Sequence, residues 1–252
     1  MPQLNRSQKK SQRPVALITG GAKRVGKAIA LALAKRGYDL AFTYHRSNAQ
    51  AALLVAELTQ MSCSALAIKV DLTTPKAASQ LAAKYRRKFD RLDVLVHNAS
   101  LFEPSDFNSP SPKKLNAMFA IHVTTPMLLT AELAGVLKQA HGHVITLTDL
   151  LAEKPMPGYA GYCATKAALQ NLTLSMARRL APEVTVNGIA PGVVEWPDDM
   201  SEADREKYLQ RVPLKRAGTP DDVAELVCFL ASTGSYITGQ IIKLDGGRSI
   251  FF

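Results

Sequence analysis

The sequence predicts a single α/β domain in which helices cover both faces of a seven-stranded parallel sheet, a doubly wound arrangement. Two observations indicate this fold. Seven short apolar runs alternate with six longer segments of helical period, and a glycine-rich turn joins the first run to the first helical segment. The chain of 252 residues has the length of one such domain, and its hydrophobic share of 47% allows a large core.

The elements follow one another in a regular order, without a repeat or a low-complexity tract. Strands are expected at 15–19, 39–43, 65–70, 93–97, 143–148, 184–189 and 240–244. Helices are expected at 24–36, 48–61, 75–89, 112–138, 159–181 and 220–232, and Pro126 should kink the fourth. Residues 192–218 are irregular around a short polar helix near 201–211, and such a long excursion is typical of a functional lid.

Composition excludes several classes of protein. No run of about 18 apolar residues is present, so no membrane-spanning helix is expected, and the N-terminus lacks the apolar segment of a secretory signal. Cys63, Cys163 and Cys228 show neither the spacing of a disulfide framework nor that of metal ligands. No metal site is therefore expected, and this cysteine usage suits the reducing cytoplasm.

The net charge of +10 does not gather into one stripe. Four positive charges fall within residues 1–13, which are expected to form a short flexible basic tail before a domain at 14–252. The other charges are scattered, and no DNA- or RNA-binding signature accompanies them, so no nucleic-acid partner is expected. A basic balance of this kind suits an anionic cofactor or substrate.

A glycine-rich turn, residues 19–26, is the most informative segment of the chain. It joins a strand to a helix, where glycine lets the backbone bend and approach a ligand closely. The unpaired N–H groups and the dipole of the helix then favour an anion. Gly20, Lys23, Arg24 and Val25 are the expected phosphate-binding residues. Taken alone, a turn of this kind is also compatible with an ordinary strand-to-helix loop.

The end of the second predicted strand indicates which dinucleotide is bound. An NAD site normally places an Asp or Glu about 20 residues beyond the glycine turn, where it binds the ribose 2′-hydroxyl. Here His45, Arg46 and Ser47 occupy that place, and the guanidinium of Arg46 suits a phosphate. NADPH is therefore expected in preference to NADH. The alternative is a solvated helix start with Ser47 as its N-cap.

The next two strand ends carry further polar groups. Asp71 can accept a hydrogen bond from an adenine amino group, or it can cap a helix that begins near Thr74. Asn98 can connect neighbouring strands through its side chain, and the small Ala99 leaves room for a cofactor. Both strand ends are therefore expected to contact the cofactor.

Tyr162 and Lys166 form the most specific pair. They lie four residues apart in a predicted helix, so their side chains share a face. A free tyrosine has a pKa of about 10 and is a poor acid at neutral pH. A nearby ammonium lowers that pKa, which makes Tyr162 a candidate proton donor to a carbonyl or imine that accepts a hydride. Taken alone, such a pair is also common on amphipathic helices.

Together these motifs resemble the short-chain dehydrogenase/reductase family over nearly the whole chain, from about Pro14 to Ser249. The matching positions are the glycine turn, Asp71, Asn98-Ala99, Tyr162 with Lys166, Asn187 with Pro191-Gly192, and Gly239 with Asp245-Gly246-Gly247. The resemblance implies a Rossmann fold, and a homotetramer packed through the helices near 112–138 and 159–181. It implies that Tyr162 donates a proton and that Lys166 binds the nicotinamide ribose and lowers the tyrosine pKa. It also implies that Pro191-Gly192 contacts the nicotinamide.

Three departures from the family pattern narrow the expected function. Arg24 replaces the usual middle glycine, Asp149 stands where most members have a catalytic serine, and His122 stands where most have an asparagine that supports a proton-relay water. The first two, with residues 45–47 and 98–102, resemble the pteridine reductase branch, which includes bacterial dihydromonapterin and dihydrofolate reductases. His122 either replaces the relay water or merely fills space.

In that branch the pterin lies between the nicotinamide and an aromatic ring, a role that falls to Phe102. Ser100 and Arg24 are then expected close to the pterin and the cofactor phosphates. Trp196, the single tryptophan, is expected either in the pocket wall or in half-buried packing. A carboxylate at Asp149 can accept from the amino and N–H groups of a pterin, whereas a serine suits a carbonyl oxygen. The alternative is that Asp149 caps the loop after the fifth strand.

The expected function is NADPH-dependent reduction of a pterin of the dihydrobiopterin, dihydromonapterin or dihydrofolate type. A hydride would pass to a C=N carbon, with Tyr162 as the proton donor. Two other functions remain as alternatives. One is reduction of a 3-oxoacyl thioester or another carbonyl compound, and the other is a catalytically idle protein that senses nucleotides.

The predicted site thus has three sets of residues. The catalytic set is Asp149, Tyr162 and Lys166. The cofactor-binding set is Gly20, Lys23, Arg24, Val25, His45, Arg46, Ser47, Asp71, Leu72, Asn98, Ala99, Ser100, Lys166, Pro191 and Gly192. The substrate-binding set is Arg24, Ser100, Phe102, Tyr162 and Trp196.

Overall fold

A computed structural model describes residues 13–197 and 200–250, and within them seven strands form one sheet whose neighbours are all parallel. The strands are β1 (Val15–Ile18), β2 (Asp39–Tyr44), β3 (Ala65–Lys69), β4 (Val94–His97), β5 (His143–Leu147), β6 (Thr185–Pro191) and β7 (Ile241–Leu244). Their order is β3-β2-β1-β4-β5-β6-β7, so the direction of winding reverses between β1 and β4. The predicted α/β class and doubly wound seven-stranded sheet are confirmed.

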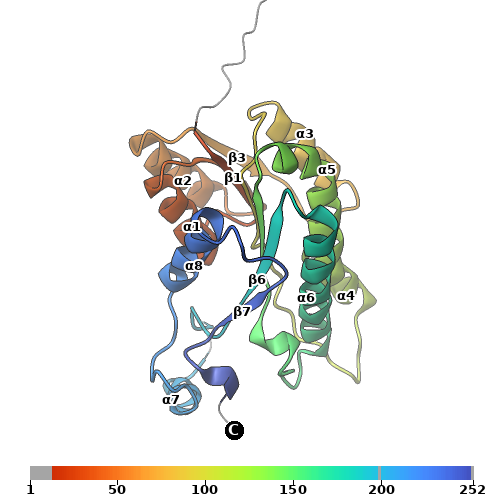
Figure 1. Ribbon diagram of the computed structural model, residues 1–252. Coiled ribbons are helices and arrows are strands. Elements are labelled where there is room, and N and C mark those ends of the chain that lie inside the picture. Colours follow the sequence, from red (N-terminus) through yellow and green to blue (C-terminus); the bar gives the residue numbers. More distant parts are fainter. Residues whose placement is uncertain (1–12, 198–199, 251–252) are drawn as a thin grey trace, which may run out of the picture.

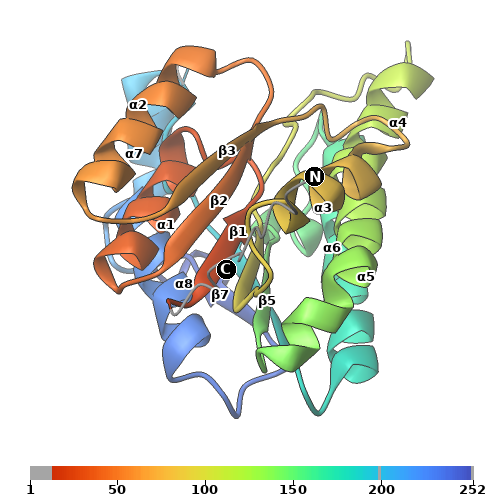
Figure 2. The ribbon, with the colours of Figure 1, turned by 90° about the horizontal axis from the view of Figure 1, so that it is seen from above.

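Helices cover both faces of the sheet (Figure 2). One face carries α1 (Arg24–Lys35), α2 (Asn48–Gln60) and α8 (Pro220–Ser232). The other carries α3 (Ala77–Arg86), α5 (Thr125–Gln139) and α6 (Ala160–Leu180). Two further helices are α4 (Pro112–Phe119), which precedes α5, and α7 (Glu202–Gln210), which lies beyond the sheet at the bottom of Figure 1. The predicted helices agree closely with these bounds, and the third is shorter than expected at both ends.

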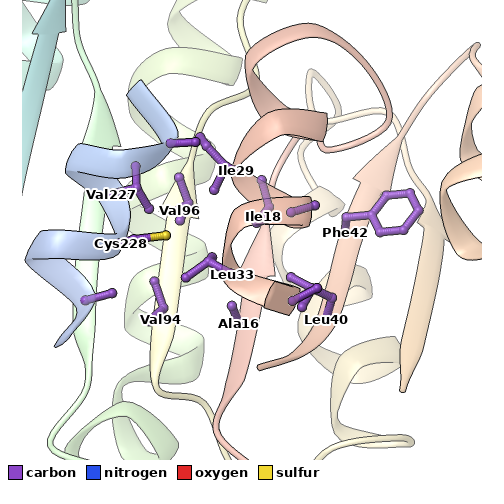
Figure 3. Packing of buried hydrophobic residues seen from close by; sticks show 14 of the residues in the cluster. Ala16, Ile18, Ile29, Leu33, Leu40, Phe42, Val94, Val96, Val227 and Cys228 are labelled. Atoms are coloured by element: carbon purple, nitrogen blue, oxygen red, sulfur yellow. The ribbon is translucent and has the colours of Figure 1, made fainter. Parts of the chain in front are cut away.

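Apolar side chains at helical spacing fix α1 to the sheet. Ile29 and Leu33 lie one turn apart in α1, and both are fully buried in a cluster with Ile18 of β1 and Val96 of β4 (Figure 3). Val227 of α8 belongs to the same cluster. Full burial of one such side chain contributes about 1.5–3 kcal/mol. Because α1 begins at the glycine turn, this packing also holds the turn in place.

On the opposite face, α5 packs through a similar stripe. Leu129, Leu133 and Leu137 recur at one-turn spacing and are fully buried. By length and composition alone, Pro112–Gln139 is the one helical stretch within the described residues that could cross a membrane, with a mean hydropathy of 1.4. In the fold this stretch forms part of the layer over the sheet, and its buried leucines account for part of its apolar composition, since 39% of the most apolar window is buried.

A π-helical turn, Ala120–Thr124, divides the stretch that the sequence predicts as one helix. The next helix, α5, starts at Thr125 directly after this turn, so Pro126, which has no backbone N–H to donate, stands just beyond it. The structure therefore shows an interruption of the predicted helix next to Pro126, in the form of a π turn. His122 in this turn is almost fully buried, and π turns are frequent at functional sites.

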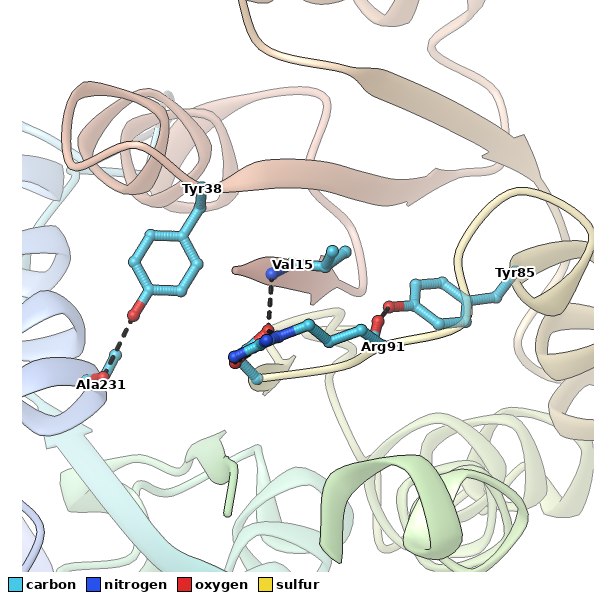
Figure 4. A network of polar contacts seen from close by, with 6 residues as sticks. Val15, Tyr38, Tyr85, Arg91 and Ala231 are labelled. Atoms are coloured by element: carbon cyan, nitrogen blue, oxygen red, sulfur yellow. Dashed lines mark hydrogen bonds and ion pairs between the residues drawn. The ribbon is translucent and has the colours of Figure 1, made fainter. Parts of the chain in front are cut away.

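Polar contacts close the sheet at the amino ends of β1 and β4 (Figure 4). The carboxylate of Asp93 accepts from the backbone N–H of Val15 at 2.8 Å and forms an ion pair with Arg91 at 2.6 Å. The hydroxyl of Tyr85 donates to the carbonyl of Arg91, and that of Tyr38 donates to the carbonyl of Ala231 at 3.2 Å. These side chains satisfy the buried backbone groups at this edge, so the edge is structural.

The predicted basic tail lies mostly outside the described residues. Its last member, Arg13, is described and is bound to the domain. The Arg13 guanidinium donates to the carbonyl of Gly37 at 2.7 Å and lies 3.7 Å from the carboxylate of Asp39. Arg13 is thus held against the domain that the sequence predicts from residue 14 onward.

The carboxyl ends of the strands form the opposite edge, toward the bottom of Figure 1. In open α/β sheets, ligands bind beyond these ends, where the strand order reverses. Here the reversal places the glycine turn after β1 beside the end of β4. A ligand site is therefore expected at this edge, among the residues that follow the strands β1 to β6.

Candidate active site

The glycine turn packs so closely that side chains would not fit within it. Gly20 has a φ of +67°, and a Cβ there would lie 3.0 Å from the Cα of Ala99. A Cβ on Gly26 would lie 2.2 Å from the carbonyl oxygen of Gly20. The N–H of Gly20 donates to the hydroxyl of Thr43 at 2.9 Å, which links the turn to β2. Only glycine permits this approach of the backbone to the start of α1.

Asn98 connects the ends of β1 and β4, as the sequence predicts. Its side-chain amide donates to the carbonyls of Thr19 and Gly20, each at 3.0 Å. In return, the Thr19 hydroxyl accepts from the N–H groups of Asn98 and Ala99 at 3.0 and 3.1 Å. The small Ala99 packs directly against Gly20, so this pair of strand ends is held rigidly.

Arg24 is the first residue of α1 and has a φ of +54°, in the left-handed region that favours glycine. Its guanidinium forms an ion pair with Glu195, which follows β6. Lys23 occupies the N-cap position with an exposed side chain, while Val25 is half-buried. The contact with Glu195 brings the glycine turn and the segment after Pro191 together across the edge of the sheet.

The residues expected to select the cofactor lie at the end of β2. His45 Nε2 is 3.8 Å from the carboxylate of Asp71, and both side chains are partly exposed. Ser47 occupies the N-cap position of α2, but within the described part of the chain its side chain accepts no cap hydrogen bond from that helix. The N-cap alternative therefore holds for the position of Ser47 and not for a capping contact of its side chain. Arg46 is exposed, as a phosphate-binding side chain at a cofactor edge would be.

Asp71 closes a turn and does not cap the helix expected near Thr74, because α3 begins only at Ala77. Its Oδ1 accepts from the N–H of Thr73 at 3.0 Å and from the Thr73 hydroxyl at 2.7 Å. The Thr73 N–H bond, with smaller contributions from His45 and Arg46, holds the pKa of Asp71 below its ordinary value. Leu72 is buried, and its carbonyl accepts from the Thr125 hydroxyl at 2.8 Å. This strand end is thus tied to α5.

Tyr162 and Asp149 form the centre of the site. Tyr162 lies in the first turn of α6, and its hydroxyl donates to Asp149 Oδ2 at 2.7 Å. The other oxygen, Asp149 Oδ1, accepts from the N–H of Leu151 at 2.9 Å and caps the short 3₁₀ turn Leu150–Ala152. The capping interpretation of Asp149 therefore holds for one oxygen, while the other contacts Tyr162, and the catalytic role of Asp149 stays a prediction.

Lys166 lies one turn beyond Tyr162 and is 2% exposed. Its ammonium donates to the carbonyl of Leu147 at 2.8 Å and stands 5.6 Å from the centre of the Tyr162 ring. Burial lowers the pKa of Lys166 to about 8, although the nearby Asp149 works in the opposite direction.

The pKa of Tyr162 moves against the expectation from the sequence. Burial, together with the charge of Asp149 and the hydrogen bond to it, raises the pKa of the phenol well above its ordinary value. The expected lowering by Lys166 is thus outweighed, because a carboxylate in direct contact opposes ionisation. A hydrogen bond from Ser100 acts in the other direction and lowers the same pKa.

His122 reaches the site from the π turn. Its Nε2 lies 2.9 Å from the Ser100 hydroxyl and 3.2 Å from the N–H of Leu101, and its Nδ1 lies 2.8 Å from the Thr165 hydroxyl. The ring also packs edge-on against Tyr162, with centroids 5.6 Å apart. The structure therefore places His122 in the polar network of the site, which excludes the interpretation that it merely fills space.

Phe102 faces two tyrosines. Its ring stacks on Tyr159, with centroids 4.2 Å apart and an angle of 12°, and meets Tyr162 edge-on at 4.7 Å. The Phe102 side chain remains 48% exposed. A flat aromatic ring thus stands beside Tyr162, and Tyr159 already covers part of it.

The contacts of Trp196 are those of a packing residue, which was one of the two roles expected for it. Its ring meets Tyr208 of α7 edge-on at 5.5 Å, and the Arg205 guanidinium lies 5.7 Å from its centre. The Tyr208 hydroxyl accepts from the N–H of Val193 at 3.0 Å. Trp196 therefore anchors α7, the helix of the predicted lid, to the segment after β6.

The Pro191-Gly192 segment continues β6 into the site. The N–H of Gly192 donates to the carbonyl of Leu244 at 3.0 Å, so the sheet extends to this residue. A Cβ on Gly192 would lie 3.0 Å from the Tyr208 hydroxyl. Asn187, also part of the matching motif, donates to the carbonyl of Ile237 at 2.7 Å and is structural. The segment faces the glycine turn through the Glu195 contact described above.

Four site residues were not predicted from the sequence. Thr43 and Thr165 supply hydroxyls, Tyr159 supplies a ring, and Glu195 supplies a counter-ion. Tyr159 stands three residues before Tyr162, a spacing that places both on one side of the chain and that offered a signal. Glu195 offered none, because its partner is distant in the sequence.

These groups fit a nicotinamide dinucleotide. The tight glycine turn presents the amino end of a twelve-residue helix, α1, and exposed cationic and hydroxyl side chains surround it. In the described residues no three His, Cys, Asp or Glu side chains gather to hold a metal ion. The chemistry available therefore consists of a buried phenol, a carboxylate, an ammonium and a phosphate cradle.

Comparison with known proteins agrees with this geometry. The family model described as enoyl-(acyl carrier protein) reductase matches residues 20–249. The chain is 36% identical over 242 residues to the 3-oxoacyl-[acyl-carrier-protein] reductase of Synechocystis sp., covering 94% of this chain and 97% of that protein. It is 33% identical over 279 residues to pteridine reductase 1 of Leishmania tarentolae, covering 94% and 96%.

A solved structure shows the same architecture. A mutant of a Serratia marcescens short-chain dehydrogenase/reductase is 33% identical, with a TM-score of 0.87 over 94% of this chain and 98% of that one. The chain belongs to the short-chain dehydrogenase/reductase family. It is accordingly an oxidoreductase of the kind that uses NAD(H) or NADP(H).

Proposed function

We propose that the protein is an NADPH-dependent reductase of pterins, acting on a dihydropterin of the dihydrobiopterin, dihydromonapterin or dihydrofolate type. The observation that carries the proposal is the hydrogen bond of 2.7 Å from the Tyr162 hydroxyl to the carboxylate of Asp149. A dihydropterin presents amino and ring N–H donors beside the C=N bond to be reduced. A carboxylate next to the proton donor is the acceptor that such donors require.

The same carboxylate disfavours a simple ketone. A carbonyl oxygen needs hydrogen-bond donors as negative charge develops on it. Asp149 has no proton to donate when it is ionised, and its charge opposes an oxyanion formed beside Tyr162. The raised pKa of Tyr162 has the same cause, after burial. A substrate that engages Asp149 Oδ2 removes this obstacle and frees the phenol to donate its proton.

The residues of the chain then act in sequence. Asp149 and the Phe102 platform orient the ring, with one face of Phe102 already stacked on Tyr159. NADPH, when bound, supplies the hydride to the C=N carbon. The O–H bond of Tyr162 breaks as its proton passes to the adjacent nitrogen. Lys166, held at the carbonyl of Leu147, stabilises the resulting phenolate.

The preference for NADPH rests on the end of β2. His45, Arg46 and Ser47 offer an imidazole, a guanidinium and a hydroxyl where an acidic residue would repel a 2′-phosphate. Arg46 is exposed, and the Ser47 side chain accepts no cap hydrogen bond in the described part of α2, which supports a role for both in holding a phosphate. Charge-assisted bonds of this type contribute roughly 1.5–3 kcal/mol each.

A second candidate is reduction of a 3-oxoacyl thioester, and sequence similarity favours it. Several relatives that carry that name are 33–36% identical to this chain, while the pteridine reductase is 33% identical. The identities are close, whereas the carboxylate at Asp149 bears directly on the reacting atoms. For that reason we place the pterin first and retain the thioester as the alternative.

The test is NADPH oxidation with dihydrobiopterin, dihydrofolate and an acetoacetyl thioester in parallel. We expect consumption with at least one dihydropterin or dihydrofolate and little with the thioester. Turnover of the thioester alone would overturn the proposal in favour of the second candidate. Absence of turnover with all three would favour a catalytically idle nucleotide-sensing protein.

Substitution of Asp149 separates charge from shape. Asp149→Asn keeps an oxygen that can cap the N–H of Leu151, and it removes the charge at Tyr162. We expect dihydropterin turnover to fall steeply in both Asp149→Asn and Asp149→Ser. Any side activity on a simple ketone should survive or rise in Asp149→Ser. Intact pterin turnover in both variants would reduce Asp149 to a loop cap.

The proposal extends to assembly and location. We propose a homotetramer packed through α5 and α6, acting in the cytoplasm on a small pterin or folate, without a nucleic-acid or membrane partner. Met127 and Leu128 on α5 and Leu174 on α6 are exposed large apolar side chains, which supports an interface there. Light scattering of the purified protein at several concentrations measures the assembly directly.

A further inference from the structure

The imidazole of His122 is held in one tautomer by its neighbours. The N–H of Leu101 lies 3.2 Å from Nε2, and a backbone N–H can only donate, so Nε2 carries no proton. The contact with Thr165, on the other side of the ring, indicates the same tautomer. Its hydroxyl donates to the carbonyl of Tyr162 at 2.7 Å, so at 2.8 Å it must accept from His122 Nδ1. Two independent contacts thus place the single proton on Nδ1.

The ring also stays neutral. His122 is 1% exposed, and burial, with the nearby Lys166 ammonium, lowers its pKa to about 2. The charged or titratable groups that face this part of the site are Asp149 after β5, and Tyr162 and Lys166 on α6. A neutral Nδ1–H imidazole is therefore the form present throughout the working pH range.

This tautomer fixes the direction of the Ser100 hydroxyl. Because Nε2 is unprotonated, the contact of 2.9 Å has Ser100 as the donor and His122 as the acceptor. The same hydroxyl lies close enough to Tyr162 to donate to the phenol oxygen, where it lowers the tyrosine pKa. Ser100 therefore has two acceptors for one proton, His122 Nε2 and the Tyr162 oxygen.

The described side chains give this network no exit at its Thr165 end. It runs from Ser100 through His122 to Thr165 and ends on the backbone carbonyl of Tyr162, which accepts and cannot pass a proton on. At this end the network can therefore hold the Ser100 hydroxyl but cannot relay its proton.

We propose that His122 is a positioning residue: it holds the Ser100 hydroxyl beside Tyr162, and this hydroxyl turns from Nε2 to the phenolate oxygen as Tyr162 loses its proton. The Tyr162 O–H bond breaks and a bond from that proton to the substrate atom forms, while the hydride comes from NADPH, which becomes NADP⁺. Ser100 keeps its own proton throughout. The proposal rests on Tyr162 as proton donor in the proposed function, and it holds for either candidate substrate.

A substrate-independent measurement comes first. In ¹⁵N-histidine-labelled protein without ligand, the His122 signal is assigned by its loss in His122→Gln. We expect shifts of an unprotonated Nε2 and a protonated Nδ1, unchanged between about pH 5 and 8. A protonated Nε2, or titration in this range, would overturn the proposal whatever the enzyme reduces.

Kinetics test the coupling to Ser100. We expect His122→Leu and Ser100→Ala each to lower kcat about tenfold, with an unchanged KM for NADPH in His122→Leu, and the double variant to lose no more kcat than Ser100→Ala alone. His122→Gln, whose amide oxygen can replace Nε2 as acceptor, should retain kcat within about threefold. Two outcomes would contradict a positioning role for His122. One is that the kcat losses of the two single variants add up in the double variant, and the other is that His122→Leu and His122→Gln lose kcat equally.

A second variant and the choice of substrate keep the test of His122 decisive. Thr165→Val is close in shape and removes the acceptor of Nδ1, so it serves if His122→Leu does not fold, and it should also lower kcat without changing the KM for NADPH. The assays use whichever substrate the wild-type enzyme reduces. Failure with every dihydropterin would therefore count against the proposed function, while the tautomer and the double-variant result decide the role of His122.

Discussion

The two halves of the active site are built in different ways. On the reaction side, Tyr162, Lys166 and His122 are 5%, 2% and 1% exposed, and each is hydrogen-bonded to another part of the site. On the cofactor side, the close contacts involve backbone and glycine, while the long side chains of Arg24 and Arg46 lie in solvent. One half is a set of fixed side chains, and the other is a fixed backbone with adaptable side chains.

This difference corresponds to what each half does. Proton transfer needs groups held at hydrogen-bond distance before the reaction, and a buried network supplies that order because every member must keep its partner. Binding a phosphate needs shape from the backbone and charge from cations that can adjust. We therefore expect substitutions on the reaction side to lower kcat and those on the cofactor side to raise KM.

The largest expected effect comes from Tyr162→Phe. This variant keeps the ring that packs against Phe102 and His122 and removes the proton. We expect kcat to fall by roughly a hundredfold or more, with little change in NADPH affinity measured by fluorescence titration. Lys166→Met is the comparison variant, and it should harm both kcat and NADPH binding. Near-normal turnover by Tyr162→Phe would remove it from the mechanism.

Arg46→Ala tests the cofactor side. Loss of one charge-assisted bond to the 2′-phosphate should raise the KM for NADPH at least about tenfold, while use of NADH stays almost unchanged. Steady-state kinetics with both cofactors measure the split. A parallel loss with NADH and NADPH would mean that Arg46 is structural and that the contrast between the halves does not extend to this residue.

The pH dependence distinguishes the buried ammonium from the exposed cations. Burial lowers the pKa of Lys166 to about 8, so we expect kcat/KM to fall above pH 8, by about tenfold at pH 9 if the ammonium is required. The unfolded state binds this proton up to about pH 10.5, so this group makes the fold more stable, not less, as pH rises from 8. Circular dichroism over this range should therefore show folded protein while activity declines.

The smallest expected effect concerns Arg24 and appears in stability. A φ of +54° strains any residue except glycine, by about 1–2 kcal/mol. Arg24→Gly relieves this strain, and Arg24→Ala retains it, while both lose the exposed ion pair with Glu195. We expect the Gly variant to be more stable than the Ala variant by about 1 kcal/mol in denaturant unfolding, the reverse of their order in a helix interior. Equal stabilities would mean that the strain is relieved elsewhere.

Much of the fold follows from the sequence because buried parallel strands and amphipathic helices have distinct periods. All seven strands were predicted within about two residues, and Tyr162 with Lys166 could be placed on one helix face by spacing alone. The π turn at 120–124 was not predicted, since its composition continues the helical pattern on both sides.

The sequence indicates the residues of the candidate site better than it indicates the contacts between them. The sequence suggests for Asp149 either a catalytic or a capping role, and the structure shows the cap on one oxygen and a contact with Tyr162 on the other. For Asp71 the sequence also suggests a helix cap, whereas its contacts with Thr73 close a turn before α3. The direction of the Tyr162 pKa was missed, because desolvation and the proximity of a carboxylate are properties of the assembled fold.

The π turn also bears on which length changes this enzyme can tolerate during evolution. Each residue added to or removed from a helix rotates everything beyond it by about 100°. Deletion of one residue between 120 and 124 would allow a continuous helix from Pro112 to Gln139, but it would swing His122 away from Ser100 or displace the buried leucines of α5. Loops at the surface can change length freely, whereas this stretch is fixed in residue number, and related sequences that keep His122 should align here without a gap.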